Sequence, residues 1–253
     1  MPDLVVLCYH AVSRTWPAAL SVTPANLRRQ LASLVKRGYR GATFTEAVLG
    51  PPRAPTVCVT FDDAYVSTLT QALPILDELG LPGTVFAPTA YIGAREPMSW
   101  PGIDHWLDTE HRSELVPMDW DDLAQLRERG WEVGSHTFSH PQLTQIDDDD
   151  LNRQLQRSKH DLESRLGADC TSLAYPYGDY DRRVVEATHR AGYAAAAGLP
   201  TRIPAVTPLT WPRLGIYRKD GAVTFGLKVS RVVRGLRRAH GWDAAHRVVR
   251  AFQ

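Results

Sequence analysis

Short apolar runs alternate along the chain with longer segments in which apolar residues recur every three or four positions. The short runs predict strands at 4–9, 56–61, 131–136, 193–198 and 213–218, a strand followed by a loop within 83–92, and a strand ending in a turn within 171–178. The longer segments predict helices, at 23–38, 66–80, 119–130, 147–167 and 181–193. Strands and helices that alternate in this way predict an α/β fold with a mostly parallel sheet, either a barrel or a doubly wound sheet.

Local signals mark where several of these helices begin and end. Thr23 is expected to cap the first helix, with Pro24 at its first position and Gly38 at its end. The acidic run at 147–150 suits the positive end of a helix dipole better than a metal site. Residues 93–118 lack a regular pattern, and this insertion could shape a substrate groove.

The composition is that of one globular domain. The chain has 253 residues, of which 43% are hydrophobic and 23% charged, and barrels of this length are commonly single domains. The net charge of +1 gives no indication of nucleic-acid binding.

The three cysteines, Cys8, Cys58 and Cys170, each lie in or beside an apolar run, which predicts buried free thiols and weakly favours a reducing compartment. We find no signal-peptide pattern and no long apolar segment, and therefore expect a cytoplasmic protein.

Two adjacent carboxylates, Asp62 and Asp63, follow directly on the strand predicted at 56–61. Barrels and open α/β sheets place their chemistry at the carboxyl ends of strands. Because neighbouring residues of a strand face opposite sides, we expect the two carboxylates to have different tasks. One can bind a metal ion, while the other takes a proton from the metal-activated water.

Two histidines, His136 and His140, follow the strand predicted at 131–136. Residues four positions apart share one face of a helical turn, and imidazole nitrogens bind divalent metals. Thr137 occupies the position where the H-E-x-x-H arrangement of metalloproteases has glutamate, so the general base must come from elsewhere. One of the two aspartates could complete a His-His-Asp site with open positions for water and substrate.

A third polar strand end follows in the stretch AYPYG at 174–178. Together with TFDD at 60–63 and HTFSH at 136–140, this stretch resembles the motifs of the polysaccharide deacetylases, carbohydrate esterase family 4. The resemblance covers roughly residues 3–218. It implies a single domain with the distorted (β/α) barrel of the NodB-homology fold. It also implies metal-dependent removal of an N-acetyl group, or in some members another acyl group, from an amino sugar.

The resemblance assigns roles to individual residues. Asp62 matches the general base of the family, and Asp63, His136 and His140 match its metal ligands. The backbone N–H of Tyr177 matches the donor that stabilises the tetrahedral oxyanion. One divalent metal ion is implied, with Zn²⁺ as the default for such a site and Ni²⁺, Co²⁺ or Mn²⁺ as alternatives.

Two positions depart from the pattern of the family. Many members hold the base with an arginine of the third motif, where this chain has Ala174 and Tyr175. We expect Arg213, at the start of the last predicted strand, to orient Asp62 instead. Many members also have a histidine acid near the C-terminus, and the last predicted strand of this chain has none. His10 is a candidate for the acid, with a structural or substrate-binding role as the alternative.

Two aromatic residues are candidates for the substrate groove: Tyr65, just after the aspartates, and Trp211, two residues before Arg213. The catalytic domain is expected to span 1–222, followed by a basic helical tail at 223–253. The segment 229–253 has the pattern of a basic amphipathic helix. It would be either an outer helix with a solvated basic face or a peripheral contact with the inner membrane face.

The function predicted from these residues is hydrolysis that removes the N-acetyl group of an N-acetylhexosamine. The expected partner is an N-acetylated glycan or a lipid-linked oligosaccharide precursor. Two alternatives stay open: a deformylase or other deacylase on the same scaffold, and a non-catalytic glycan-binding protein derived from a deacetylase. The sugar, its linkage and the oligomeric state are not specified by the sequence.

Overall fold

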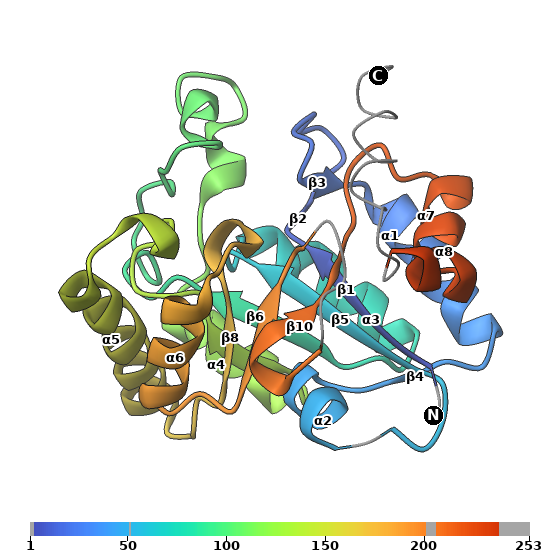
Figure 1. Cartoon of the computed structure of the whole chain (residues 1–253). Helices are drawn as coiled ribbons and strands as arrows, with labels where there is room; N and C mark the ends of the chain where they lie inside the picture. The colour runs from blue at the N-terminus through green and yellow to red at the C-terminus, as the bar shows by residue number, and fades with distance from the viewer. Residues whose placement is uncertain (1–2, 51, 201–205, 238–253) are drawn as a thin grey trace.

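Parallel strands form a nearly closed barrel that is surrounded by helices (Figure 1). The computed structural model describes residues 3–50, 52–200 and 206–237. The strands lie in the order β10–β9–β8–β7–β6–β5–β1–β11, with β4 paired to the start of β5, and a separate pair joins β2 and β3. Their bounds are β1 Leu4–Tyr9, β2 Ala11–Val12, β3 Ser21–Val22, β4 Arg40–Gly41, β5 Thr56–Asp62, β6 Gly83–Ala87, β7 Glu132–Ser135, β8 Ser172–Ala174, β9 Ala195–Gly198, β10 Trp211–Pro212 and β11 Leu214–Gly215.

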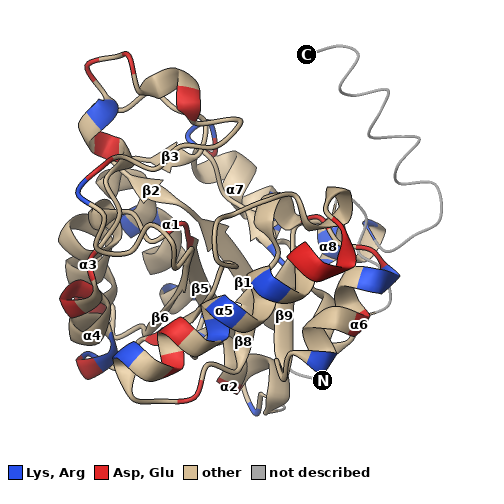
Figure 2. Ribbon diagram, turned by 90° about the vertical axis from the view of Figure 1, so that its left-hand side faces the viewer, with Lys and Arg blue, Asp and Glu red and all other residues tan. Residues whose placement is uncertain are grey.

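Helices cover the outside of this barrel. Their bounds are α1 Pro24–Lys36, α2 Phe44–Leu49, α3 Leu73–Glu78, α4 Trp120–Glu128, α5 Asp148–Leu166, α6 Arg182–Arg190, α7 Ala222–Val229 and α8 Arg231–Leu236. The predicted cap at Thr23 is confirmed, because its side chain accepts a hydrogen bond from the Asn26 N–H. The acidic run lies at the start of α5, as predicted, and Asp147 caps that helix by accepting from the Asp150 N–H. The outer face of α5 carries both positive and negative side chains (Figure 2).

The central strands are buried on both faces, which explains why they appear in the sequence as continuous apolar runs. Every residue of β5 is buried. Val57 and Val59 point outward and pack in the large core cluster with Leu27 of α1. Cys58 points inward and packs with Val6 of β1 in a second cluster that fills the barrel. The three cysteines are buried and unpaired, as predicted.

The barrel closes at a single residue, Arg213. Just before it, β10 pairs with β9, and just after it, β11 pairs with β1. The Arg213 N–H donates to the Gly198 carbonyl at 3.0 Å, and the Ile216 N–H donates to the Cys8 carbonyl at 2.8 Å. One short segment therefore joins the two edges of the sheet and leaves Arg213 at the seam.

Several elements differ from the prediction. The helix predicted at 66–80 begins with a π-helical turn, Thr68–Ala72. The strand predicted at 213–218 is replaced by the two short strands on either side of Arg213. Short elements such as α2 and β4 have too few residues to show a period and were not predicted.

The start of the predicted tail packs on the barrel. Phe225 and Val229 of α7 are buried in the same cluster as Leu27 and Leu31 of α1. The rest of the tail, 238–253, lies outside the described residues. None of the described helices has both the length and the apolar composition needed to cross a membrane.

Candidate active site at the carboxyl ends of the strands

The carboxyl ends of β1, β5, β7 and β8 surround a cavity of about 210 Å³. The insertion, green in Figure 1, forms another part of its wall. The lining includes the residues singled out by the motifs and part of the insertion: His10, Asp62, Asp63, Trp100, Pro101, Gly102, Ile103, His136, His140, Tyr177 and Tyr217. Polar groups that lie far apart in the sequence thus face a single space.

Three of these residues form a compact donor set. The Nε2 atoms of His136 and His140 lie 3.4 and 3.6 Å from Oδ1 of Asp63. These three side chains are all buried. His136 Nδ1 lies 2.8 Å from the Ala174 carbonyl, and a hydrogen bond donated there fixes the tautomer that leaves Nε2 free to bind a metal.

The residues of this set fit a divalent metal ion. Oδ1 of Asp63 is buried and has no hydrogen-bond partner among the described residues, although two imidazole nitrogens face it. Burial and the neighbouring His136 lower the pKa of His140 to about 3, so its ring is neutral near pH 7. Two imidazoles and a carboxylate are a typical ligand set for zinc and related metals.

The backbone around this set is left-handed at unusual positions. The described non-glycine residues with positive φ are Asp63, Ala64, Thr137, His140 and Tyr177, at φ values of 54–71°. Such conformations are uncommon outside glycine, and they cluster at functional sites. Here they all lie in the loops that follow β5, β7 and β8.

Two expectations about geometry are therefore wrong. The left-handed bend at Asp63 turns its side chain toward the same cavity as Asp62, so the two carboxylates do not face opposite sides. The histidines do not share a helical turn either. A loop with left-handed residues at Thr137 and His140 brings their rings to a centroid distance of 4.7 Å.

Asp62 belongs to a different group of contacts. Its Oδ1 and Oδ2 accept hydrogen bonds from the two terminal nitrogens of Arg213 at 2.6 and 2.8 Å. Burial raises the pKa of Asp62, but the charges of Arg213 and His136 outweigh it and hold that pKa well below the usual carboxyl range. Asp62 is thus an ionised carboxylate in a defined orientation, as expected for a residue paired with Arg213.

Two other side chains approach Asp62. The Cys8 thiol donates to its Oδ2 at 3.3 Å, and burial raises the pKa of this thiol well above its usual value, so the thiol keeps its proton. His10 Nε2 lies 4.0 Å from the same oxygen, and the His10 side chain is 16% exposed in the cavity. His10 is therefore close to the carboxylate and accessible from the cavity.

The aromatic residues lie differently from the prediction. Tyr65 is fully buried and packs edge-on against Trp16, so it cannot line the groove. Trp211 packs against the cluster inside the barrel and is not among the residues that line the cavity. The tryptophan at the cavity is Trp100 of the insertion, stacked on His140 at a centroid distance of 4.2 Å. Its only sequence signal is its place in the insertion.

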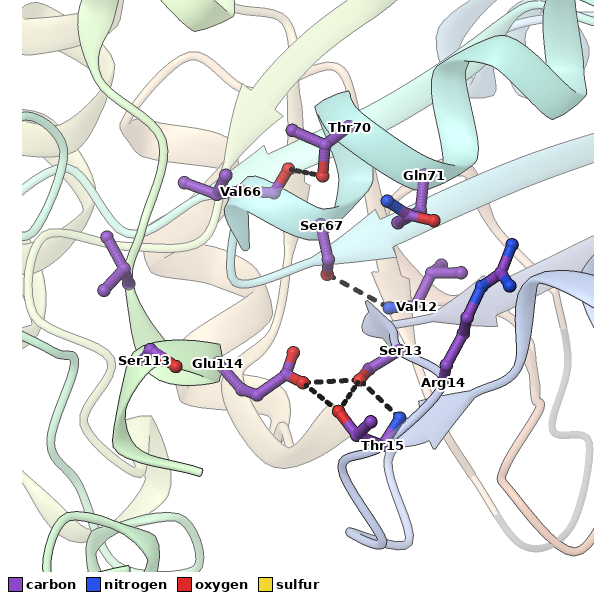
Figure 3. A pocket seen from close by; sticks show the side chains of 11 residues that line it. Val12, Ser13, Arg14, Thr15, Val66, Ser67, Thr70, Gln71, Ser113 and Glu114 are labelled. Carbon is purple, nitrogen blue, oxygen red and sulfur yellow. Dashed lines mark hydrogen bonds between the residues drawn. The ribbon is translucent and has the colours of Figure 1, made fainter. Parts of the chain in front are cut away.

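A second cavity, of about 390 Å³, lies where the insertion meets the segments that follow β1 and β5 (Figure 3). Eight of the eleven residues that line it have polar or charged side chains. Glu114 of the insertion accepts hydrogen bonds from the hydroxyls of Ser13 and Thr15, and Ser67 accepts one from the Val12 N–H. The contacts of Glu114 fasten the insertion to the loop between β2 and β3.

Comparison with known proteins identifies the family. Residues 50–196 match the family model for polysaccharide deacetylase, which is more than half of the chain. The chain belongs to the polysaccharide deacetylase family. It is 25% identical over 195 residues to the putative polysaccharide deacetylase YxkH of Bacillus subtilis, covering 75% of this chain and 62% of that protein. It is 27% identical over 182 residues to the chitooligosaccharide deacetylase of Sinorhizobium fredii, covering 71% of each.

Solved structures show the same fold. The Streptococcus pyogenes deacetylase PplD, in complex with acetate, superposes with a TM-score of 0.75 at 21% identity, over 91% of this chain and all of that one. A barrel of the NodB-homology type, expected from the sequence motifs, is therefore confirmed.

The donor set predicts tight binding of one divalent ion. We expect metal-free protein to bind one Zn²⁺ in calorimetry, and His140→Ala to weaken that binding by about 10²-fold or more, because a ligand is removed. Cys8→Ala is the matched control, since the donor atoms of Cys8, His10 and Asp62 form a second close group. Loss of the ion in Cys8→Ala and its retention in His140→Ala would place the metal in that second group instead.

Proposed function

We propose that this protein is a metal-dependent N-deacetylase that hydrolyses the acetamide of an N-acetylhexosamine in a glycan. The observation that carries the proposal is the position of an ionised carboxylate, Asp62, in the same cavity as the Asp63–His136–His140 set. Family membership supports carbohydrate deacetylation. The names of two relatives, a chitooligosaccharide deacetylase and a peptidoglycan-N-acetylmuramic acid deacetylase, support an N-acetylated amino-sugar glycan as the substrate class.

Asp63, His136 and His140 would hold the metal ion, with Zn²⁺ as the default. When bound, the ion supplies Lewis-acid activation of the attacking water and of the amide carbonyl. Asp62 lies outside this donor set, and hydrogen bonds from Arg213 and Cys8 fix the orientation of its carboxylate for proton transfer.

The remaining steps use residues of the cavity wall. Asp62 takes a proton from the attacking water as general base. The N–H of Tyr177, in a left-handed turn at the cavity wall, donates to the oxyanion that develops on the carbonyl. His10 then gives a proton to the leaving amine. Arg213 does not touch the substrate in this scheme and acts through the orientation of Asp62.

The role of Asp62 is tested by measuring release of acetate, formate or butyrate from N-acetylated, N-formylated and N-butyrylated hexosamine oligomers, respectively. Asp62→Asn keeps the shape of the side chain but removes its basicity, so we expect kcat to fall by about 10²- to 10⁴-fold. Zinc affinity, measured in parallel, should stay within about threefold of wild type, since Asp62 lies outside the donor set. Undiminished release in this variant would overturn the mechanism. Preferred cleavage of the formyl or butyryl substrate would overturn the proposed acyl group.

The role of Arg213 predicts a change in pH dependence. A general base must be ionised, so activity falls as the pH drops through its pKa. With Arg213 in place that pKa lies well below the ordinary carboxyl value of about 4, so the loss falls outside the neutral range. Arg213→Met removes the opposing charge but leaves the burial, so we expect the pKa of Asp62 to rise and the acidic limb of kcat/KM to move above about pH 5.

Arg213→Lys serves as the conservative comparison for that measurement. It keeps the charge but loses the bidentate contact, so we expect the acidic limb to stay low while kcat falls. If the Arg213→Met enzyme lost activity equally at every pH, Arg213 would have a structural role alone.

The role of His10 is tested by substitution. His10→Ala should lower kcat/KM by about 10²-fold or more, because the leaving amine loses its proton donor. His10→Gln retains a hydrogen-bond donor without an acid and should be equally impaired. A kcat/KM within about threefold of wild type in His10→Ala would exclude this residue as the acid.

A further inference from the structure

Large apolar side chains are exposed on two consecutive helices, α7 and α8. Val223 and Leu227 of α7 are 78% and 57% exposed, and Val232 and Leu236 of α8 are 71% and 53% exposed. The members of each pair are four residues apart and so lie on one face of their helix. Only three other large hydrophobic side chains of the described residues are comparably exposed, and they lie in separate elements.

The orientation of α7 is set by its opposite face. Phe225 and Val229 are buried in the core, so α7 cannot rotate to hide Val223 and Leu227. At the end of α7, the Lys228 ammonium group donates to Asp220 at 2.6 Å and to the Gly215 carbonyl at 2.9 Å. An ordinary surface helix carries its charged residues on the outer face, as α5 does (Figure 2). The outer face of α7 and α8 instead carries valine and leucine.

The charge of this region is strongly asymmetric. Residues 221–253 contain seven lysines and arginines and a single acidic residue, Asp243, so this segment carries +6 while the whole chain carries +1. Among the described residues, Arg231 and Arg234 both contact one carboxylate, that of Asp3, which leaves an excess of positive charge. Apolar side chains flanked by basic ones are the pattern of helices that lie in a membrane interface.

We propose that the α7–α8 face, formed by Val223, Leu227, Val232 and Leu236 with the basic residues beside them, docks on the surface of an anionic phospholipid bilayer. The apolar side chains would enter the boundary between headgroups and acyl chains, and the arginines would lie near the phosphates. An acidic protein partner would account for the charge, but it would not require four exposed aliphatic side chains on two helices. The bilayer accounts for both observations.

This face is connected to the catalytic cavity. Tyr217 lines the cavity, and its N–H donates to Asp220, the same carboxylate that accepts from Lys228 of α7. Val223 follows Tyr217 by six residues, a span of at most about 20 Å. Docking would therefore hold the cavity near the lipid surface. In that position the enzyme could deacetylate a glycan carried on a membrane lipid. This part of the inference rests on the proposed function, whereas the docking itself does not.

Vesicle flotation tests the docking directly. The full chain is mixed with vesicles of phosphatidylcholine, alone or with phosphatidylglycerol, at about 0.1 M and about 0.5 M NaCl. We expect flotation with the anionic vesicles at low salt, and at least about tenfold less with neutral vesicles or at high salt. The double variant Val223→Glu/Leu227→Glu should reduce flotation by at least about tenfold, and the milder Val223→Ser/Leu227→Ser should reduce it less.

Leu49→Glu is the matched control, because Leu49 is an exposed leucine of α2, at 45% exposure, away from this face. It should float like the wild type. Thermal unfolding and acetate release from a soluble chitooligosaccharide should be unchanged in all three variants, which separates loss of docking from loss of fold or catalysis. A failure of catalysis in every protein, wild type included, would affect the proposed function and not the docking.

Several outcomes would overturn the proposal. One is equal flotation of the wild type and the glutamate variant. A second is a wild-type dimer in sedimentation that the glutamate variant dissociates, which would assign the face to a second copy of the chain. A third is loss of flotation on deletion of 238–253 while the α7–α8 variants still float, which would assign the lipid contact to that segment.

Discussion

The buried ion pair between Asp62 and Arg213 is the contact on which the rest of the site depends. Both carboxylate oxygens accept hydrogen bonds from the guanidinium, whose side chain is fully buried inside the barrel. Removing one partner of such a pair leaves an uncompensated charge, at a cost of about 3–5 kcal/mol. Because Arg213 is also the residue at which the barrel closes, the orientation of the carboxylate and the closure of the sheet depend on each other.

The barrel also supports conformations that an isolated loop would not adopt. Left-handed backbone at non-glycine residues costs on the order of 1 kcal/mol or more at each position. Local hydrogen bonds offset this cost in the loop after β7, where Ser135 Oγ accepts from the Thr137 N–H and Thr137 Oγ1 accepts from the His140 N–H. These hydrogen bonds fix the loop that holds the two imidazoles toward Asp63. The short apolar strands before the loops provide the rigid frame.

Much of this arrangement could be predicted from the sequence, because strands and helices have periods and the carboxyl ends of parallel strands meet. The placement of Asp62, Asp63, His136 and His140 around one cavity follows from that rule. The orientation of Asp63 could not be predicted in this way, because the alternation of side chains along a strand ends where the backbone turns left-handed. Tyr65 and Trp211 were misplaced for a related reason. An aromatic residue beside a motif is as readily a packing residue as a ligand contact, and burial decides between the two.

The seam at Arg213 also explains why the first helix of the tail belongs with the barrel. Between the seam and α7, the chain pairs β11 with β1, passes Tyr217 at the cavity rim and reaches Asp220. Lys228 returns from α7 to Asp220 and to the Gly215 carbonyl, so the segment is held at both ends. Tyr217 therefore lies between two anchors, the buried Asp62–Arg213 pair and the partly buried Asp220–Lys228 pair. These anchors, rather than a flexible linker, would therefore fix the position of the cavity relative to any surface that binds α7.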